Sequence, residues 1–159
     1  MPVSHKVSGG GCNSSETSWG TLKYGKLTDR ASNPGKATKG SVGFDICSSQ
    51  TETILSKERH LIPTDPVLIP PPRTYIRLAP KSGLAWKFGI NVLVVVNDPK
   101  FREDVKVLLQ KHGEEALQIQ ARDQIAQGIL ERVMLPIPRE EAEKDVTKKG
   151  ALGFGEADA

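Results

Sequence analysis

From residue 22 onward, the apolar runs of the sequence are short, and proline, glycine or aspartate interrupts them. The clearest runs are residues 60–62, 67–69, 75–78, 92–96 and 105–109. Runs of this length that are rich in valine, isoleucine and leucine and bounded by turn residues are typical of β-strands. The pattern therefore predicts an all-β domain, a barrel or a sandwich, with little helix.

The composition fits one compact β domain. The chain has 159 residues, with 15 glycines, 11 prolines and only 5% aromatic residues, which favours many turns and short strands around one core. Its net charge of +3 is small and its charged residues are interspersed. Such a balance favours neither a nucleic acid nor a membrane as partner, although it does not repel a small polyanion.

The two ends of the chain differ in composition from its middle. Residues 1–21 contain glycine and serine clusters with almost no apolar periodicity, and they are predicted to form a disordered leader. Residues 22–138 hold the predicted β domain. Residues 139–159 begin with a charged, solvated linker and continue into a glycine-containing C-terminal arm.

The sequence carries no sign of export or membrane insertion. Cys12 and Cys47 do not form a Cys-x-x-Cys pair, the N-terminus has no secretory apolar segment, and no run is long enough to span a bilayer. We therefore expect a soluble, non-secreted protein of a reducing compartment, the cytoplasm or the nucleus.

One short helix is predicted after an extended run. In residues 79–85 (APKSGLA), a Ser-Gly pair follows a proline and a lysine, and Ser82 is suited to cap a helix over residues 83–88. Backbone amides at such a helix entrance converge on an anion, which suits phosphate. The same letters also occur in ordinary turns, so this segment alone does not identify a site.

Four other motifs accompany this segment, in the order residues 40–46 (GSVGFDI), 97–102 (NDPKFR), 123–127 (DQIAQ) and 149–155 (KGALGFG). In order and spacing the set resembles the motifs of the trimeric dUTPases, which hydrolyse dUTP to dUMP and pyrophosphate. The resemblance implies a jelly-roll-like dUTPase β-barrel with one short helix, a homotrimer, and a requirement for Mg²⁺. It also implies that motifs from different subunits assemble each site.

The resemblance assigns the catalytic role to Asp98, as the general base that activates water for attack on the α-phosphorus. Cleavage of a phosphoanhydride by water needs a base within hydrogen-bond reach of that water. Residues 97–99 are also three residue types that favour turns, so a plain hairpin turn is the alternative interpretation.

The remaining site residues also follow from the resemblance. The phosphates would contact Lys81, Ser82, Gly83, Gln127 and Lys149. The base and sugar would contact Asn91, Val95, Phe101 and Phe154, and Asp45 would hold Mg²⁺ through water. Phe101 is predicted to stack against the deoxyribose, and the alternative is an inward-packing strand residue. Gln127 is alternatively an exposed strand residue, and Asp45 a structural hydrogen-bonding residue near the start of a strand.

Several letters depart from the family pattern. Lys81 stands where the family has arginine, which keeps the charge but loses bidentate contact with phosphate. Residues 93–95 are Leu-Val-Val where the family has small residues, and Glu156 and Ala157 replace Ser-Thr near the γ-phosphate. These departures leave a second hypothesis open, in which the chain is a catalytically impaired nucleotide-binding or regulatory protein-interaction module with the same fold.

Two other enzyme classes fit less well. The related dCTP deaminases need a glutamate on the strand after the hairpin, and residues 107–110 (VLLQ) contain none. A metalloenzyme with histidine and cysteine ligands is disfavoured because His5, His60 and His112 are scattered along the chain.

Overall fold

The computed structural model describes residues 20–143 and 145–146. In this part of the chain it has eleven strands and one helix. The strands are β1 (Lys23–Lys26), β2 (Phe44–Cys47), β3 (Glu52–Ile54), β4 (Arg59–Ile62), β5 (Pro66–Ile69), β6 (Thr74–Ala79), β7 (Ile90–Val92), β8 (Val96–Asn97), β9 (Val107–Lys111), β10 (Leu117–Ile119) and β11 (Gln124–Arg132), and the helix is α1 (Ser82–Phe88). The prediction of an all-β fold with one short helix is confirmed.

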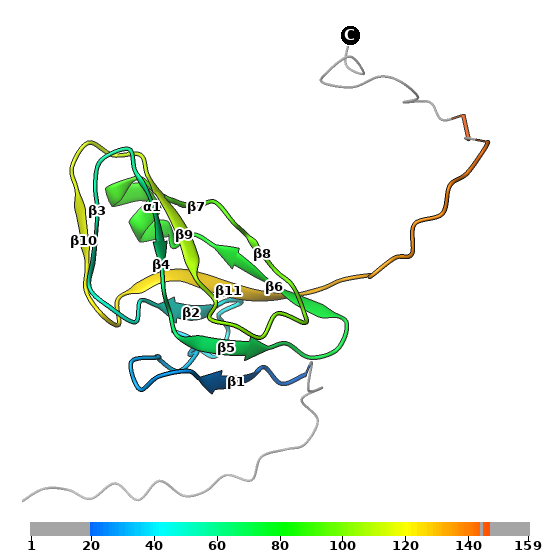
Figure 1. The fold of residues 1–159 in the computed structure, drawn as a ribbon, viewed down its shortest axis with the longest axis horizontal. Coiled ribbons are helices and arrows are strands. Elements are labelled where there is room, and N and C mark those ends of the chain that lie inside the picture. Colours follow the sequence, from blue (N-terminus) through cyan, green and yellow to red (C-terminus); the bar gives the residue numbers. More distant parts are fainter. Residues whose placement is uncertain (1–19, 144, 147–159) are drawn as a thin grey trace, which may run out of the picture.

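Within residues 20–143, all strand pairs are antiparallel and they form four sheets. Figure 1 shows their arrangement. The largest has the order β2-β11-β6-β8, and a second has the order β4-β9-β7. The pairs β1-β5 and β10-β3 complete the set. In the described residues the hydrogen-bonded ladders therefore remain separate sheets instead of closing into one continuous barrel.

The core lies between these sheets and is filled by alternate residues of the strands. Val107 and Leu109 in β9, Ile62 in β4, Ile76 in β6 and Ile54 in β3 are all completely buried. Successive side chains of a strand point to opposite faces, so the inward set of each strand packs on the other sheets. The short apolar runs of the sequence thus supply the core.

The apolar run over residues 92–96 does not form one strand. β7 ends at Val92 and pairs with β9, whereas β8 begins at Val96 and pairs with β6. Residues 93–95 carry the chain from the three-stranded sheet to the four-stranded sheet. The side chains of residues 93–96 are 39–56% exposed, which a continuous buried strand would not show.

The helix begins one residue earlier than predicted. Lys81, with an extended backbone (φ −85°, ψ 127°), is the N-cap residue of α1, and Ser82 is the first helical residue. The N-cap makes no side-chain hydrogen bond to the helix, so the prediction that Ser82 caps it is wrong. Gly89 ends the helix at φ +62°, where a Cβ atom would come within 2.8 Å of the Gly113 nitrogen. Glycine is therefore required at this position.

The chain leaves the sheets at the end of β11. Residues 133–143 run outward from the body of the protein (Figure 1), and Met134, Leu135 and Ile137 are 72–93% exposed. Among the described residues, no helix has both the length and the apolar character needed to cross a membrane.

Candidate active site

Three adjacent strands place two of the predicted site residues, Asp45 and Gln127, opposite each other. In the four-stranded sheet, Gln127 of β11 lies opposite Asp45 of β2 on one side and opposite Ala79 of β6 on the other. The predicted phosphate segment leaves the sheet directly after Ala79. Strand pairing therefore places Asp45, Gln127 and the entrance of α1 side by side, although they are far apart in the sequence.

The side chains at this point are hydrogen-bonded to one another. The Lys81 Nζ atom donates to Asp45 Oδ1 at 2.6 Å and to Gln124 Oε1 at 3.1 Å, and Gln127 Nε2 donates to the Pro80 carbonyl oxygen at 3.1 Å. We call Asp45, Lys81, Gln124 and Gln127 the Lys81 cluster. The Lys81 and Asp45 side chains are only 27% and 15% exposed. Their ion pair is therefore less screened by solvent than a pair on the open surface.

Gln124 was not expected in this cluster. Gln124 stands where the dUTPase pattern has an arginine, and the sequence alone assigns it no contact with Lys81. In the structure the Gln124 amide oxygen accepts a hydrogen bond from the lysine that replaces another family arginine. No signal in the sequence joins these two positions, because they are far apart in the chain and meet only in the folded protein.

Ser82 and Gly83 lie at the first turn of α1 and face solvent. Both residues are exposed, and a Cβ atom added to Gly83 would have no neighbour within 4 Å. In the described part of the chain the Ser82 hydroxyl makes no hydrogen bond. The hydroxyl and the first backbone amides of the helix are thus available to a ligand beside the Lys81 cluster.

The donor set here suits a magnesium ion better than a transition metal. Within residues 20–143 and 145–146, no group of three or more histidine, cysteine, aspartate or glutamate side chains could hold a metal. Asp45 supplies one carboxylate, and Mg²⁺ commonly uses one or two carboxylates together with water and substrate phosphates. Burial raises the pKa of the neighbouring Cys47 thiol, which disfavours the thiolate form that binds metals or attacks substrates.

Asp98 follows β8 directly and its side chain is exposed. The Phe101 backbone amide donates to the Asp98 carbonyl oxygen at 3.1 Å, which closes a turn. Arg102 Nη1 braces this turn by donating to the carbonyl oxygens of Pro99 (2.8 Å) and Phe101 (2.9 Å). A turn is therefore present as predicted, but it is not a hairpin, because β8 pairs with β6 whereas β9 pairs with β4 and β7. The turn presents the Asp98 carboxylate to solvent, so the turn and the catalytic hypothesis are compatible.

The candidate base and sugar contacts are distributed over β7, the crossover at residues 93–95 and this turn. Phe101 is 39% exposed and belongs to no strand, so the alternative prediction that it packs inward on a strand is wrong. Asn91 lies in β7, where its Oδ1 atom accepts from the Val92 amide at 2.9 Å. The Val95 carbonyl oxygen accepts from the Leu78 amide at 2.7 Å. Lys149 and Phe154 lie outside the described residues.

The turn that carries Asp98 and the Lys81 cluster lie toward opposite ends of β6. Asn97 pairs with Ile76, three residues before Ala79, which marks the cluster. At about 3.3 Å per residue, Asp98 is roughly 13 Å along the sheet from the cluster. In the described residues no hydrogen bond or ion pair joins Asp98 to it. One protomer therefore does not bring the candidate base and the candidate phosphate residues together.

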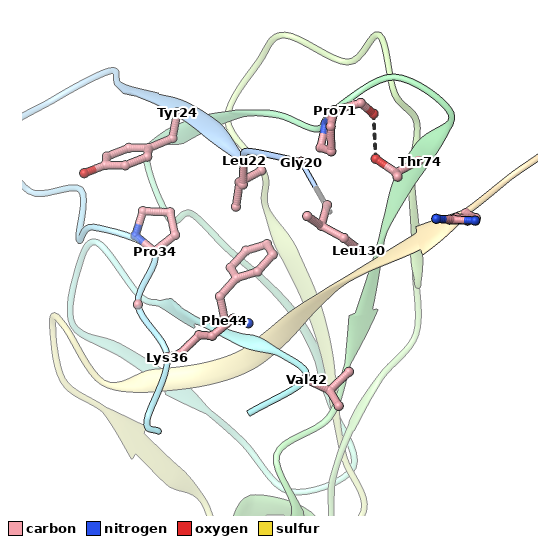
Figure 2. Close-up of a pocket in the computed structure, with 12 residues that line it drawn as sticks. Gly20, Leu22, Tyr24, Pro34, Lys36, Val42, Phe44, Pro71, Thr74 and Leu130 are labelled. Carbon is pink, nitrogen blue, oxygen red and sulfur yellow. Dashed lines mark hydrogen bonds between the residues drawn. The ribbon is translucent and has the colours of Figure 1, made fainter. Parts of the chain in front are cut away.

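A separate pocket of about 630 Å³ lies between β1 and β11. Leu22, Tyr24, Phe44 and Leu130 gather around it (Figure 2). None of the predicted site residues within the described part of the chain lines this pocket. We therefore assign it no part in the candidate active site.

Tyr75, Arg77 and Glu131 form a second polar group on β6 and β11. The Tyr75 hydroxyl and Arg77 Nε each donate to the Glu131 carboxylate at 2.6 Å. The Tyr75 hydrogen bond, followed by that of Arg77, lowers the pKa of Glu131 below 4.5, and the same bond to Glu131 raises the pKa of Tyr75 above 10.0. The stabilising contribution of Tyr75 is thus present below pH 10.0 and is lost as the pH rises through its folded pKa.

This group predicts a measurable alkaline titration. The protein has two tyrosines, so the ultraviolet absorbance of tyrosinate can be followed in the wild type and in Tyr75→Phe. Their difference gives the Tyr75 curve, and we expect its midpoint above 10.0 because ionisation would break the bond to Glu131 and place two negative charges together. A difference curve with its midpoint at or below that value would contradict the hydrogen bond.

The chain is similar in sequence to known proteins over most of its length. The sequence model of the dUTPase family matches residues 29–157. The deoxyuridine 5'-triphosphate nucleotidohydrolase of Fowl adenovirus A serotype 1 is 40% identical over 144 residues, which cover 91% of this chain and 81% of the relative. The mitochondrial enzyme of the same name from Dictyostelium discoideum is 38% identical over 135 residues, which cover 85% of this chain and 75% of the relative.

Solved structures share the fold at lower sequence identity. The dUTPase of Staphylococcus bacteriophage 80alpha with dUpNHpp superposes with a TM-score of 0.78 and 21% identity, covering 86% of this chain and 97% of that chain. A mutant dUTPase from phage phi11 of S. aureus, whose structure describes the coordination of a structural Mg(II) ion, has a TM-score of 0.73 and 18% identity, covering 80% of this chain and 100% of that chain.

Proposed function

The chain belongs to the dUTPase family, and on that basis we propose that it hydrolyses dUTP to dUMP and pyrophosphate. The proposal rests chiefly on the register of Asp45, Gln127 and Ala79 on three adjacent strands. Lys81 follows the last of these strands and donates a hydrogen bond to Asp45. This register assembles three of the dUTPase-like motifs into one polar cluster.

In the proposed mechanism Asp98 is the general base. Its carboxylate accepts a proton from a water molecule as the water oxygen forms a bond to the α-phosphorus. The bond between the α-phosphorus and the bridging oxygen to the β-phosphorus breaks, and pyrophosphate leaves with that bond's electron pair. The braced turn over residues 98–101 serves this role because it exposes the carboxylate on a hydrogen-bonded loop.

Lys81, Ser82, Gly83 and Gln127 are proposed to bind the phosphates, together with Lys149 from the C-terminal arm. A lysine ammonium group has three donors, and Lys81 uses two of them on Asp45 and Gln124. One donor therefore remains for a phosphate oxygen without loss of the existing contacts. Ser82 and Gly83 add a hydroxyl and backbone amides from the open turn of the helix.

Asp45 is proposed to hold Mg²⁺ through water. When bound, this ion would neutralise charge on the phosphate oxygens, which is its usual contribution to phosphoryl chemistry. For the nucleoside, we propose contacts from Asn91, Val95 and Phe101, with Phe154 closing over the base. Phe101 exposes its ring in a turn, so one ring face is available for stacking on the sugar.

We further propose that the protein is a homotrimer whose sites lie between subunits. Asp98 and the Lys81 cluster lie toward opposite ends of β6, so a neighbouring protomer is needed to bring them to one substrate. The exposed apolar residues 93–96 and Met134 would be covered in such an assembly. Sedimentation that shows only monomer at working concentration would contradict this proposal.

The remaining proposals concern organisation along the chain and in the cell. We infer a leader over residues 1–21, a catalytic β domain over 22–138 and an arm over 139–159 that carries the last motif. A cytoplasmic or nuclear location is proposed from the cysteine usage of the sequence, which has no Cys-x-x-Cys pair.

Gly43→Ala is expected to raise KM for dUTP several-fold with little change in stability. A Cβ atom at Gly43 would lie 2.5 Å from Gln127 Oε1 and 3.2 Å from Gln127 Cβ, so the Gln127 side chain must turn away. Gly40→Ala is the matched control, because a Cβ atom there has no neighbour within 4 Å. Equal KM values for Gly43→Ala and Gly40→Ala, from steady-state kinetics, would argue against Gln127 as a phosphate contact.

The proposed function is tested by pyrophosphate release from dUTP, dCTP, dTTP and UTP, each with and without Mg²⁺. We expect turnover that is restricted to dUTP and depends on Mg²⁺. Absence of turnover on every nucleotide would contradict the proposal and support the alternative, a nucleotide-binding or regulatory module. Turnover of several nucleotides would retain the chemistry and reject the base selectivity.

A further inference from the structure

The Asp98 turn belongs to a connecting segment with few attachments to the rest of the protein. This segment, residues 98–106, joins β8 to β9. Between Asp98 and Glu103 its hydrogen bonds in the described structure are all internal, from the Phe101 amide and from Arg102. At its start it follows β8, which has only two residues. Its position on the body therefore depends strongly on what holds its far end.

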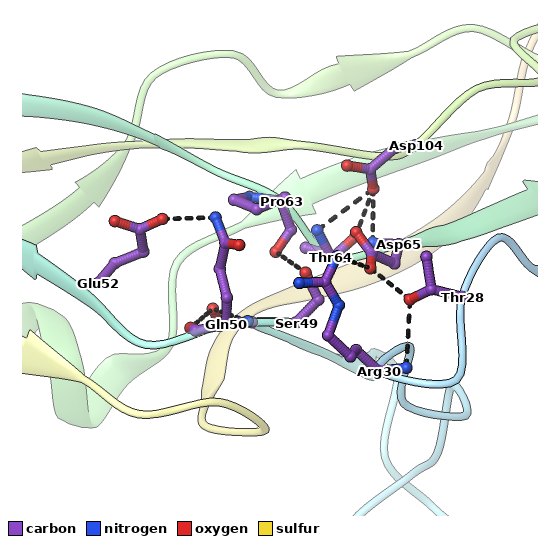
Figure 3. Close-up of polar contacts among 10 residues, drawn as sticks. Thr28, Arg30, Ser49, Gln50, Glu52, Pro63, Thr64, Asp65 and Asp104 are labelled. Carbon is purple, nitrogen blue, oxygen red and sulfur yellow. Dashed lines mark hydrogen bonds and ion pairs between the residues drawn. The ribbon is translucent and has the colours of Figure 1, made fainter.

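At the far end, the Asp104 carboxylate binds a turn that contains Thr64 and Asp65 (Figure 3). Asp104 Oδ1 accepts from the Asp65 backbone amide at 2.7 Å and from the Thr64 amide at 3.2 Å. Thr64 Oγ1 lies 3.3 Å from the same oxygen and 2.6 Å from the Val105 carbonyl oxygen. A hydroxyl has one proton, so Thr64 Oγ1 donates to the Val105 carbonyl oxygen, which is the shorter contact. The Thr64 and Asp65 backbone amides are therefore the main donors to Asp104.

The turn that receives Asp104 is itself fixed from another side. Asp65 is 7% exposed and has φ +67°, a conformation that needs support in a residue other than glycine. Its carboxylate accepts from Thr28 Oγ1 at 2.6 Å and pairs with Arg30 at 3.4 Å, and its carbonyl oxygen accepts from the Leu27 amide at 2.9 Å. The Asp104 carboxylate is therefore attached to a well-anchored part of the fold.

We propose that Asp104 is a positioning residue for Asp98, and that its bonds to the Thr64 and Asp65 amides hold the connecting segment so that the Asp98 carboxylate keeps its catalytic position. This inference rests on the proposed role of Asp98 as base. General-base catalysis requires close placement of the base relative to water, and displacements of about 1 Å can reduce the rate about a hundredfold. Asp104 is thus expected to act on kcat through the backbone, without touching the substrate.

The test compares Asp104→Ala, Asp104→Asn and the neighbouring control Glu103→Ala in the full chain. Asp104→Ala removes the acceptor, and we expect kcat for dUTP to fall about tenfold or more while KM changes less than about twofold. Asp104→Asn keeps an acceptor oxygen at the same place and is expected to retain kcat within about threefold. Glu103→Ala, an exposed residue of the same segment, is expected to match the wild type.

Amide hydrogen exchange at Phe101 and Lys106 gives a readout that does not depend on activity. We expect faster exchange at both amides in Asp104→Ala and wild-type rates in Asp104→Asn, because the two amides donate within the segment that Asp104 holds. If Asp104→Ala fails to fold, Asp104→Glu takes its place, since the longer side chain shifts the acceptor and must lower kcat in the folded protein.

The outcomes separate this inference from the proposed function. Wild-type kcat and wild-type exchange in Asp104→Ala would overturn the positioning role, and so would an equal loss of kcat in Asp104→Ala and Asp104→Asn. A wild-type protein without dUTP turnover would contradict the proposed function instead, and the hydrogen-exchange comparison would still decide whether Asp104 holds the segment.

Discussion

Replacing Asp98 with asparagine is expected to lower kcat for dUTP by a factor of about 10² to 10⁴, the usual contribution of a positioned general base. Asparagine has nearly the same shape but cannot accept the proton from the attacking water. Asp98 is exposed and its side chain supports no other contact in the described structure, so the substitution should leave the fold unchanged. Steady-state pyrophosphate release provides the measurement.

Two controls make this result specific. Asp29→Asn removes another exposed carboxylate in a turn and should leave kcat unchanged. Binding of the non-hydrolysable analogue dUpNHpp to Asp98→Asn should remain within a few-fold of the wild type, because the phosphates are held by other residues. A variant with kcat within a few-fold of the wild type would exclude Asp98 as the base.

Leu109→Ala is expected to lower the free energy of unfolding by about 2–5 kcal/mol, the usual cost of a large-to-small change in a core. Leu109 is completely buried in β9, the middle strand of its sheet, where it pairs with His60 of β4 and Val92 of β7. Truncation leaves a cavity, and pairing with β4 and β7 on both sides of β9 keeps the backbone from moving in to fill it. Since small domains have total stabilities of about 5–15 kcal/mol, this loss is a large fraction.

The measurement is chemical denaturation at one fixed protomer concentration, because assembly contributes to apparent stability. Leu61→Ala in β4 is the matched control, since Leu61 is 53% exposed and its truncation should cost far less. Equal losses for the two variants would contradict the core described above.

Strands β4, β5, β6 and β9 were predictable because their signal is local, whereas β1, β10 and the long β11 match none of the apolar runs named from the sequence. Alternating inward residues, such as Val107 and Leu109, leave a pattern in the sequence that packing then uses. The division of residues 92–96 between two sheets was not predictable in this way. Each half is apolar, and only the choice of partner strand, β9 or β6, determines where the chain crosses over.

The candidate site shows the same limit. Its motif residues were named from resemblance, and the structure brings Asp45, Lys81 and Gln127 together through the register of three strands. Two supporting contacts carry no local signal: the contact of Gln124 with Lys81, and the contact of the Thr64 amide with Asp104, the residue proposed to position Asp98. Long-range polar contacts of this kind depend on tertiary structure, so the sequence names the reacting groups more readily than the groups that position them.

The phosphorus atom that is attacked can be identified by following the oxygen atom of the attacking water. dUTP is hydrolysed by the wild-type protein in water enriched in the heavy oxygen isotope, and the products are analysed by mass spectrometry. Attack on the α-phosphorus predicts one labelled oxygen in dUMP and none in pyrophosphate. Label in pyrophosphate, release of orthophosphate, or no hydrolysis at all would contradict the account.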